Sequence, residues 1–250
     1  MIVAAATVLT LGVAAPGVQA QQGGGRGRGG APPATPKLSA PFDLTGYWVA
    51  VITQDWRQRM VTPAKGDYDS LPINLAAKQA GDAWDPAKDE AAGEACKAFG
   101  AGGIMQMPTR LHITWQDDNT LQVDTDFGQQ TRVFHFGNWT APRGVRPTWQ
   151  GASVAAWEGV GRGGPGRGSL RIVTTNLRPG YIRRNGVPYS ANATVTEFWD
   201  VGRERNGDQW LQVTSMVDDS TYLRQPWVAV FQFKKEPDGS KWNPEPCTAQ

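Results

Sequence analysis

The sequence predicts a mainly β protein, an antiparallel up-and-down barrel of about eight or nine strands with a helical segment inserted at 71–99. Three observations predict it. From residue 109 onward, β-branched and aromatic runs alternate with turn residues at hairpin spacing. About nine such runs occur, and that many antiparallel strands usually close or stack. The chain also contains 11 Trp and 8 Phe, which favour a large aromatic core or an aromatic-lined cavity.

Residues 1–20 are predicted to be a signal peptide that is cleaved near Ala20. An apolar run from Ile2 to Ala15 is followed by a helix-breaking proline and by small residues at the cleavage positions. The run is too short to span a bilayer, so no integral membrane span is expected after cleavage. No Lys or Arg precedes the run, which departs from the usual pattern, and an apolar N-terminal core strand is the alternative interpretation.

The Gly- and Pro-rich residues 21–40 cannot bury enough apolar surface to offset their chain entropy. We therefore predict a disordered linker there and a single β domain over 41–250. Cys96 and Cys247 are predicted to form a disulfide, because exported proteins mature in oxidising surroundings. A net charge of +2 gives no indication of nucleic-acid binding.

The first strand is expected at 45–53, where β-branched and aromatic residues gather. Helices are expected at 71–83 and 86–99, although each contains a glycine that opposes it. Asp85 can cap the second helix, and a proline suits its first position. The remaining strands are expected at 109–116, 120–127, 130–136, 149–157, 169–176, 192–200, 209–217 and 227–234.

Hydrophobic matching predicts the pairing of the first hairpins, because a slip of one residue would reverse every side chain. A three-residue turn at 117–119 sets His112 opposite Asp124. A two-residue Gly-Gln turn then sets His135 opposite Gln122. One face of this sheet is therefore apolar, and it carries Leu111, Ile113, Trp115, Leu121, Val123, Phe134 and Phe136.

The opposite face of these strands carries both histidines of the chain, and three interpretations are open. In the first, this face is the solvated outer wall of the sheet. In the second, it lines a polar cavity in which Asp124 orients His112 as a general base, with His135 beside them. In the third, His112, Asp124 and His135 bind a divalent metal. No local metal spacing and no cofactor motif occurs, so we predict neither a metal nor a cofactor.

Other residues are candidates for a ligand site. Glu197 alternates with apolar residues, which indicates either a cavity carboxylate or a partner for an arginine. The basic segment 178–186 contains Tyr181 and is interpreted either as a clamp for an anion or as a solvated loop. The glycine-rich residues 158–168 are interpreted as a hairpin loop. The predicted lining of a ligand cavity is Trp115, Phe134, Phe136, Glu197, Trp199 and Tyr181.

The run Gly46-Tyr47-Trp48 resembles the G-x-W signature that opens lipocalin and wider calycin barrels. The resemblance implies that Trp48 closes one end of a barrel and packs near a basic residue of the last strand. Lys234 or Lys235 would fill that role. The inserted helical segment and the additional strands depart from this family.

The segments 196–199 and 217–227 are similar to a group of exported bacterial proteins of uncharacterised function. That resemblance implies a bacterial periplasmic or extracellular protein and a calycin-like barrel, and it implies no substrate.

Three functions remain open. The first is a binding protein that holds a small apolar or amphipathic molecule among its aromatic side chains. The second is a barrel enzyme, such as an isomerase, cyclase or hydrolase, that transfers protons with His112 and Asp124. The third is an interaction protein that docks on an envelope protein through Trp139 and Trp149.

Overall fold

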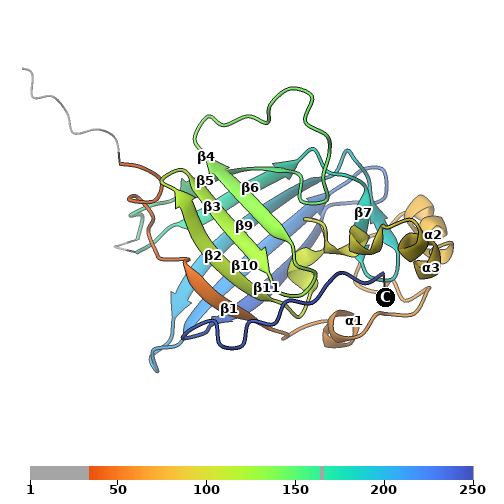
Figure 1. Cartoon of the computed structure of the whole chain (residues 1–250), viewed down its shortest axis with the longest axis horizontal. Coiled ribbons are helices and arrows are strands. Elements are labelled where there is room, and N and C mark those ends of the chain that lie inside the picture. The colour runs from red at the N-terminus through yellow and green to blue at the C-terminus, as the bar shows by residue number, and fades with distance from the viewer. Residues whose placement is uncertain (1–33, 164–165, 250) are drawn as a thin grey trace, which may run out of the picture. The chain divides into compact units, whose positions relative to one another are not determined.

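A computed structural model describes residues 34–163 and 166–249, and its central feature is a closed β-barrel (Figure 1). Around the barrel the strands follow the order β1-β11-β10-β9-β6-β5-β4-β3-β2, and β7 and β8 form a separate small sheet. The predicted signal peptide and most of the predicted linker lie outside the described residues. The strands are β1 Gly46–Val51, β2 Arg110–Asp117, β3 Thr120–Thr125, β4 Thr131–Phe136, β5 Ala152–Glu158, β6 Ser169–Thr175, β7 Gly180–Arg183, β8 Val187–Tyr189, β9 Thr194–Arg203, β10 Gln209–Asp218 and β11 Trp227–Lys235.

The predicted mainly β barrel is confirmed, with one departure from purely antiparallel order. Strands β4 and β5 run parallel, whereas all other neighbours in the barrel are antiparallel. Parallel neighbours require a connection that returns to the starting end of the sheet. Residues 137–151 make this return over the outside of the barrel, as the long loop beside β4 shows in Figure 1.

Short helices gather at one end of the barrel, which we call the cap end (Figure 1). Asn74 and Asp85 cap α2 and α3 by accepting hydrogen bonds from backbone N–H groups. The predicted continuous helix over 86–99 is wrong, because Gly93 adopts a left-handed φ of 70° and divides it. The helices are α1 Trp56–Met60, α2 Leu75–Asp82 and α3 Pro86–Ala91, with 3₁₀ turns η1 Ala95–Phe99 and η2 Ile104–Gln106.

The predicted pairing of β2 with β3 is confirmed, since His112 lies opposite Asp124. The predicted pairing of β3 with β4 is wrong by two residues, and His135 lies opposite Thr120. The cause is a longer loop over 126–129. Its first residue, Asp126, leaves the strand and accepts hydrogen bonds from the side chain of Thr109 and the backbone N–H of Arg110. A shift of two residues keeps every side chain on its predicted face.

At the end opposite the cap, Trp48 is fully buried and its indole N–H donates to the carbonyl of Leu44 over 2.8 Å. The ammonium of Lys235 lies 4.4 Å from the centre of the Trp48 ring, whereas Lys234 pairs with Asp208. Lys235 is therefore the basic residue that the G-x-W resemblance implied. Residues 34–45 also cover this end, where the indole N–H of Trp157 donates to the carbonyl of Pro36.

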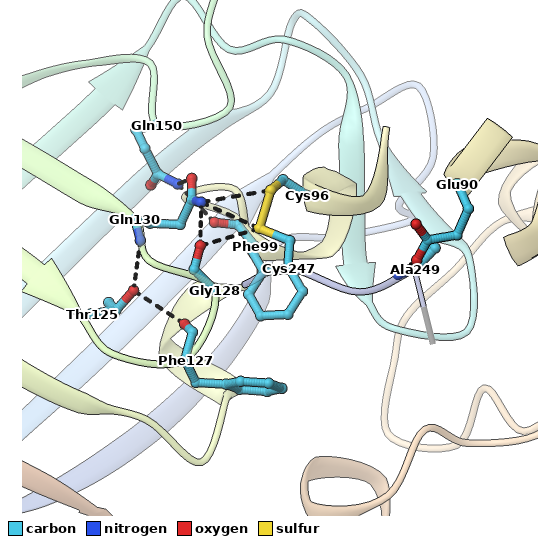
Figure 2. The surroundings of a disulfide bond; sticks show 10 residues. All are labelled: Glu90, Cys96, Phe99, Thr125, Phe127, Gly128, Gln130, Gln150, Cys247 and Ala249. Atoms are coloured by element: carbon cyan, nitrogen blue, oxygen red, sulfur yellow. Dashed lines mark hydrogen bonds between the residues drawn. A yellow bond between two sulfur atoms is a disulfide. The ribbon is translucent and has the colours of Figure 1, made fainter. Parts of the chain in front are cut away.

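The C-terminal segment returns to the cap end and is fixed there by the predicted disulfide (Figure 2). The sulfur atoms of Cys96 in η1 and Cys247 lie 2.01 Å apart. The amide of Gln130 donates to the carbonyl of Gly128 over 2.6 Å and lies 3.3 Å from the sulfur of Cys247. Gly128 has a φ of 86°, and a Cβ atom there would lie 2.2 Å from the ring of Phe99, so only glycine fits.

Candidate functional site

The barrel interior is apolar except for a few side chains, and the most polar of these is an ion pair. Arg132 points inward from β4 and Glu197 points inward from β9. Their side chains are 0% exposed. The guanidinium donates two hydrogen bonds to the carboxylate, over 3.0 and 2.5 Å. This forked geometry is the strongest that two charged side chains can adopt.

Two aromatic residues accompany the ion pair. The guanidinium carbon of Arg132 lies 4.9 Å from the centre of the Phe134 ring. That ring meets Trp199 edge to face, with 5.5 Å between the centroids. Nε of Arg132 and Nε1 of Trp199 are both buried N–H donors that have no acceptor in the protein. Buried donors are nearly always paired, so these two N–H groups are free to bind an acceptor, as are several other buried polar atoms elsewhere in the described residues.

The wall on one side of Glu197 is built from small residues. Ser215 lies opposite Glu197 on β10, and Ala229 lies opposite Ser215 on β11. On the other side Glu197 faces the larger Ile172 of β6. The interior therefore combines a charged anchor, two aromatic rings and a stretch of wall with little side-chain volume.

Side chains fill the barrel in this conformation. Most inward residues are less than 9% exposed. A hollow of about 540 Å³ opens on the outer wall instead, beside Trp210, Asp200 and Gln212. A molecule that binds inside must therefore displace interior side chains.

Both histidines lie on the outer wall of the barrel. The ring of His112 stacks on Tyr47, with 4.2 Å between the centroids, and meets Trp242 of the C-terminal segment at 6.0 Å. Asp124 accepts hydrogen bonds from the side chains of Thr131 and Gln122. Within the described residues, no hydrogen bond or ion pair joins His112 to Asp124.

His135 stacks on Trp139 of the 137–151 loop, with 4.0 Å between the centroids. Burial lowers the pKa of His135, and Asp117 opposes the shift. Each histidine thus provides a flat surface for a segment that crosses the outside of the barrel. In the part of the chain that the structure describes, no group of three His, Cys, Asp or Glu side chains could hold a metal ion.

The predicted ligand-lining residues separate into two sets. Phe134, Phe136, Glu197 and Trp199 are buried in the interior, and half-buried Trp115 packs on Phe136 at 5.4 Å. Tyr181 lies outside the barrel in β7, where its hydroxyl donates to Asp89 over 2.7 Å. Burial and that hydrogen bond raise the pKa of Tyr181.

Trp139 and Trp149 are both half-buried rather than exposed. Trp139 rests on His135, and the guanidinium of Arg178 lies 4.5 Å from the centre of the Trp149 ring. Each ring is therefore partly covered by a neighbouring side chain of the same chain.

Comparison with protein-family models, with curated proteins and with solved structures finds no match for this chain. The described helices are all too short or too polar to cross a membrane.

Proposed function

We propose that this barrel binds a small organic molecule, mainly apolar and carrying at least one hydrogen-bond acceptor, beside the Arg132–Glu197 ion pair. The observation that carries the proposal is the pair of buried donors, Nε of Arg132 and Nε1 of Trp199, that have no acceptor in the protein. They supply the acceptor-binding end of a site whose remaining wall is apolar and aromatic, as in most small-molecule sites.

The energetics of the ion pair support this proposal. Moving two charges from water into an apolar interior costs several kcal/mol for each ion, and their attraction repays this only in good geometry. Apolar residues of similar volume often serve stability equally well or better. A pair with 0% exposure, flanked by unpaired donors, is therefore better explained by recognition than by stability.

We propose that a ligand enters at the cap end, where strand pairing between β1 and β11 stops short. β1 ends at Val51, opposite Gln232, so residues 227–231 of β11 have no strand neighbour on that side. The helix α1 covers this edge, where the guanidinium of Arg59 lies 5.0 Å from the ring of Phe231. We expect a ligand to enter when α1 moves away, and because the interior is tightly packed this step should be slow.

Native mass spectrometry of protein exported to a bacterial periplasm tests the proposal. The wild type should carry a bound small molecule. The double variant Arg132→Met/Glu197→Leu keeps the side-chain volume but removes the polar anchor, so it should fold and lose that molecule. Repeatedly empty wild-type protein, or equal occupancy in the double variant, would contradict the proposal.

The proposal includes an address in the periplasm or outside the cell. The disulfide supports it, because such bonds are rare in the reducing cytosol. The apolar run from Ile2 to Ala15 supports it independently. Expression of the full chain in a bacterium, followed by sequencing of the mature N-terminus, should show cleavage near Ala20; an uncleaved protein in the cytosol would contradict it.

A further inference from the structure

Three arginines line one small hollow at the cap end, between α1, η2 and β7. They are Arg59, Arg183 and Arg184, and the remaining lining residues are neutral: Gln58, Gln106, Met107 and Ile182. Arg59 is 3% exposed and Arg183 is 2% exposed. Three cationic side chains around a single small hollow, two of them buried, are unusual, because like charges repel and burial removes their hydration.

Protein groups compensate these charges only in part. Nε of Arg59 donates to the carbonyl of Gln106 over 2.9 Å, and Arg184 donates to the carbonyl of Arg59 over 3.1 Å. Arg183 donates to the carbonyl of Asp69 and the hydroxyl of Ser70. Both terminal nitrogens of Arg59 and Nε of Arg183 are buried without an acceptor.

The nearest carboxylates act only from a distance. None of the three arginines forms an ion pair within 4.0 Å in the described residues. Asp55, Asp67 and Asp69 raise the pKa of Arg183 slightly against the larger lowering by burial. Asp67 is already paired with Arg57 at 2.8 Å. Burial lowers the pKa of Arg59 to about 10, although Asp55 opposes the shift and the ring of Phe231 faces the guanidinium at 5.0 Å.

The size of the hollow limits what can supply the missing negative charge. Its free volume is about 10 Å³, which is the room that one water molecule needs. A tetrahedral oxoanion or a carboxylate group is too large without movement of the arginines. A halide ion is larger than water but much smaller than a tetrahedral oxoanion, so it needs only a small outward shift of the arginine side chains; it accepts several N–H hydrogen bonds and carries a full charge.

We infer that this hollow binds one chloride ion, which accepts hydrogen bonds from Arg59 and Arg183 and thereby fixes α1 against β7. The inference is independent of the ligand proposed for the barrel interior. It assigns a function to the basic segment 178–186, as a clamp for a single small anion within the cap.

Thermal unfolding of the full, disulfide-bonded protein tests the inference when chloride replaces gluconate at constant ionic strength. At ten times its Kd, chloride should raise the Tm by about 3–6 °C. Bromide should act similarly, and sulfate should act less because it does not fit. An equal rise with sulfate, or no rise with chloride, would overturn the inference.

Two variants locate the effect. Arg59→Gln removes the buried guanidinium and should abolish the chloride-dependent rise in Tm. Arg57→Gln is the control, because Arg57 lies on the same helix with its side chain 64% exposed. It should keep the full rise. Loss of the rise in both variants, or in neither, would place the anion elsewhere and refute the assignment.

A direct measurement covers the case in which Arg59→Gln does not fold. Crystals of the wild type soaked in bromide should show an anomalous-scattering peak within hydrogen-bond distance of Arg59 and Arg183. A peak only at the protein surface, or none, would show that water alone fills the hollow, and the inference would be wrong.

Discussion

Splitting the interior ion pair should cost much more stability than removing both partners. Arg132 and Glu197 are joined by two hydrogen bonds and are 0% exposed. Either Arg132→Met or Glu197→Leu leaves the opposite charge buried with no partner. Each single variant should therefore lose about 3–5 kcal/mol of unfolding free energy.

The double variant should behave differently, because it leaves no charge in the interior. Apolar replacement of a buried ion pair is neutral or stabilising by about 1–4 kcal/mol. If each single variant loses about 3 kcal/mol and the double variant loses nothing, the coupling energy between Arg132 and Glu197 is about 6 kcal/mol. A domain of ordinary stability, about 5–15 kcal/mol, would be close to unfolding in either single variant.

Urea unfolding with the disulfide intact, followed by circular dichroism and tryptophan fluorescence, measures these differences. The exposed pair Lys78–Asp82 is the control, because its side chains are 55% and 44% exposed. A double-mutant cycle on Lys78 and Asp82 should give a coupling energy of less than about 1 kcal/mol. If the unfolding free energy of each single variant of the interior pair lies within about 1 kcal/mol of the wild-type value, water reaches the pair and the argument from desolvation fails.

Three further predictions use other parts of the molecule. Burial lowers the pKa of His135 in the folded state, so the stabilising effect of its neutral form is present above the unfolded pKa near 6.5 and is lost as the pH falls through the folded pKa. The variant His135→Gln should therefore flatten the acid side of the curve of unfolding free energy against pH. An unchanged curve would contradict this. The disulfide closes a separation of 151 residues, so Cys96→Ser/Cys247→Ser should lose about 5 kcal/mol in chemical unfolding, and a loss below about 1 kcal/mol would exclude the chain-entropy argument. Gly128→Ala should destabilise by about 2 kcal/mol more than Gly207→Ala, because both have positive φ but only a Cβ at Gly128 would meet an aromatic ring; equal effects would show that the ring moves aside.

Much of the barrel wall follows from local patterns. Alternation of apolar and polar residues predicts which side of a strand is buried, and it does so even where the pairing is shifted. β4 shows this, because its register differs from the prediction by two residues while Phe134 and Phe136 remain inside. Alternation has a period of two residues, so it fixes the face and leaves the longitudinal position of the strand open.

The direction of β5 and the extent of the cap depend on contacts between distant segments. The 137–151 loop reverses the expected direction of β5 because its residues bind to the outer wall, for example where Trp139 stacks on His135. The short strands β7 and β8 and the helix α1 have weak local signals and are held by tertiary packing. Arg183, for instance, is fixed by backbone carbonyls of residues more than 110 positions away.

The histidine face illustrates what the sequence leaves undecided. A strand of a barrel has the same alternation whether its polar face borders solvent or a cavity. Only closure of the sheet decides which, and here it places His112 and Asp124 outside. Their predicted alignment across β2 and β3 is correct, yet each side chain takes other partners.

The interior ion pair, in contrast, left a usable signal in the sequence. Glu197 is in phase with inward apolar residues of β9, and Arg132 is in phase with Phe134 and Phe136 of β4. Either residue alone suggests an error in the predicted register, because a lone charge in an apolar face is too costly to bury. When two opposite charges each alternate with the inward apolar residues of a different strand, they are predicted to pair across a closed barrel. Only such pairing makes the burial of both charges tolerable. The pair therefore tests barrel closure: in a flat sheet, β4 and β9 would lie too far apart for the two side chains to meet.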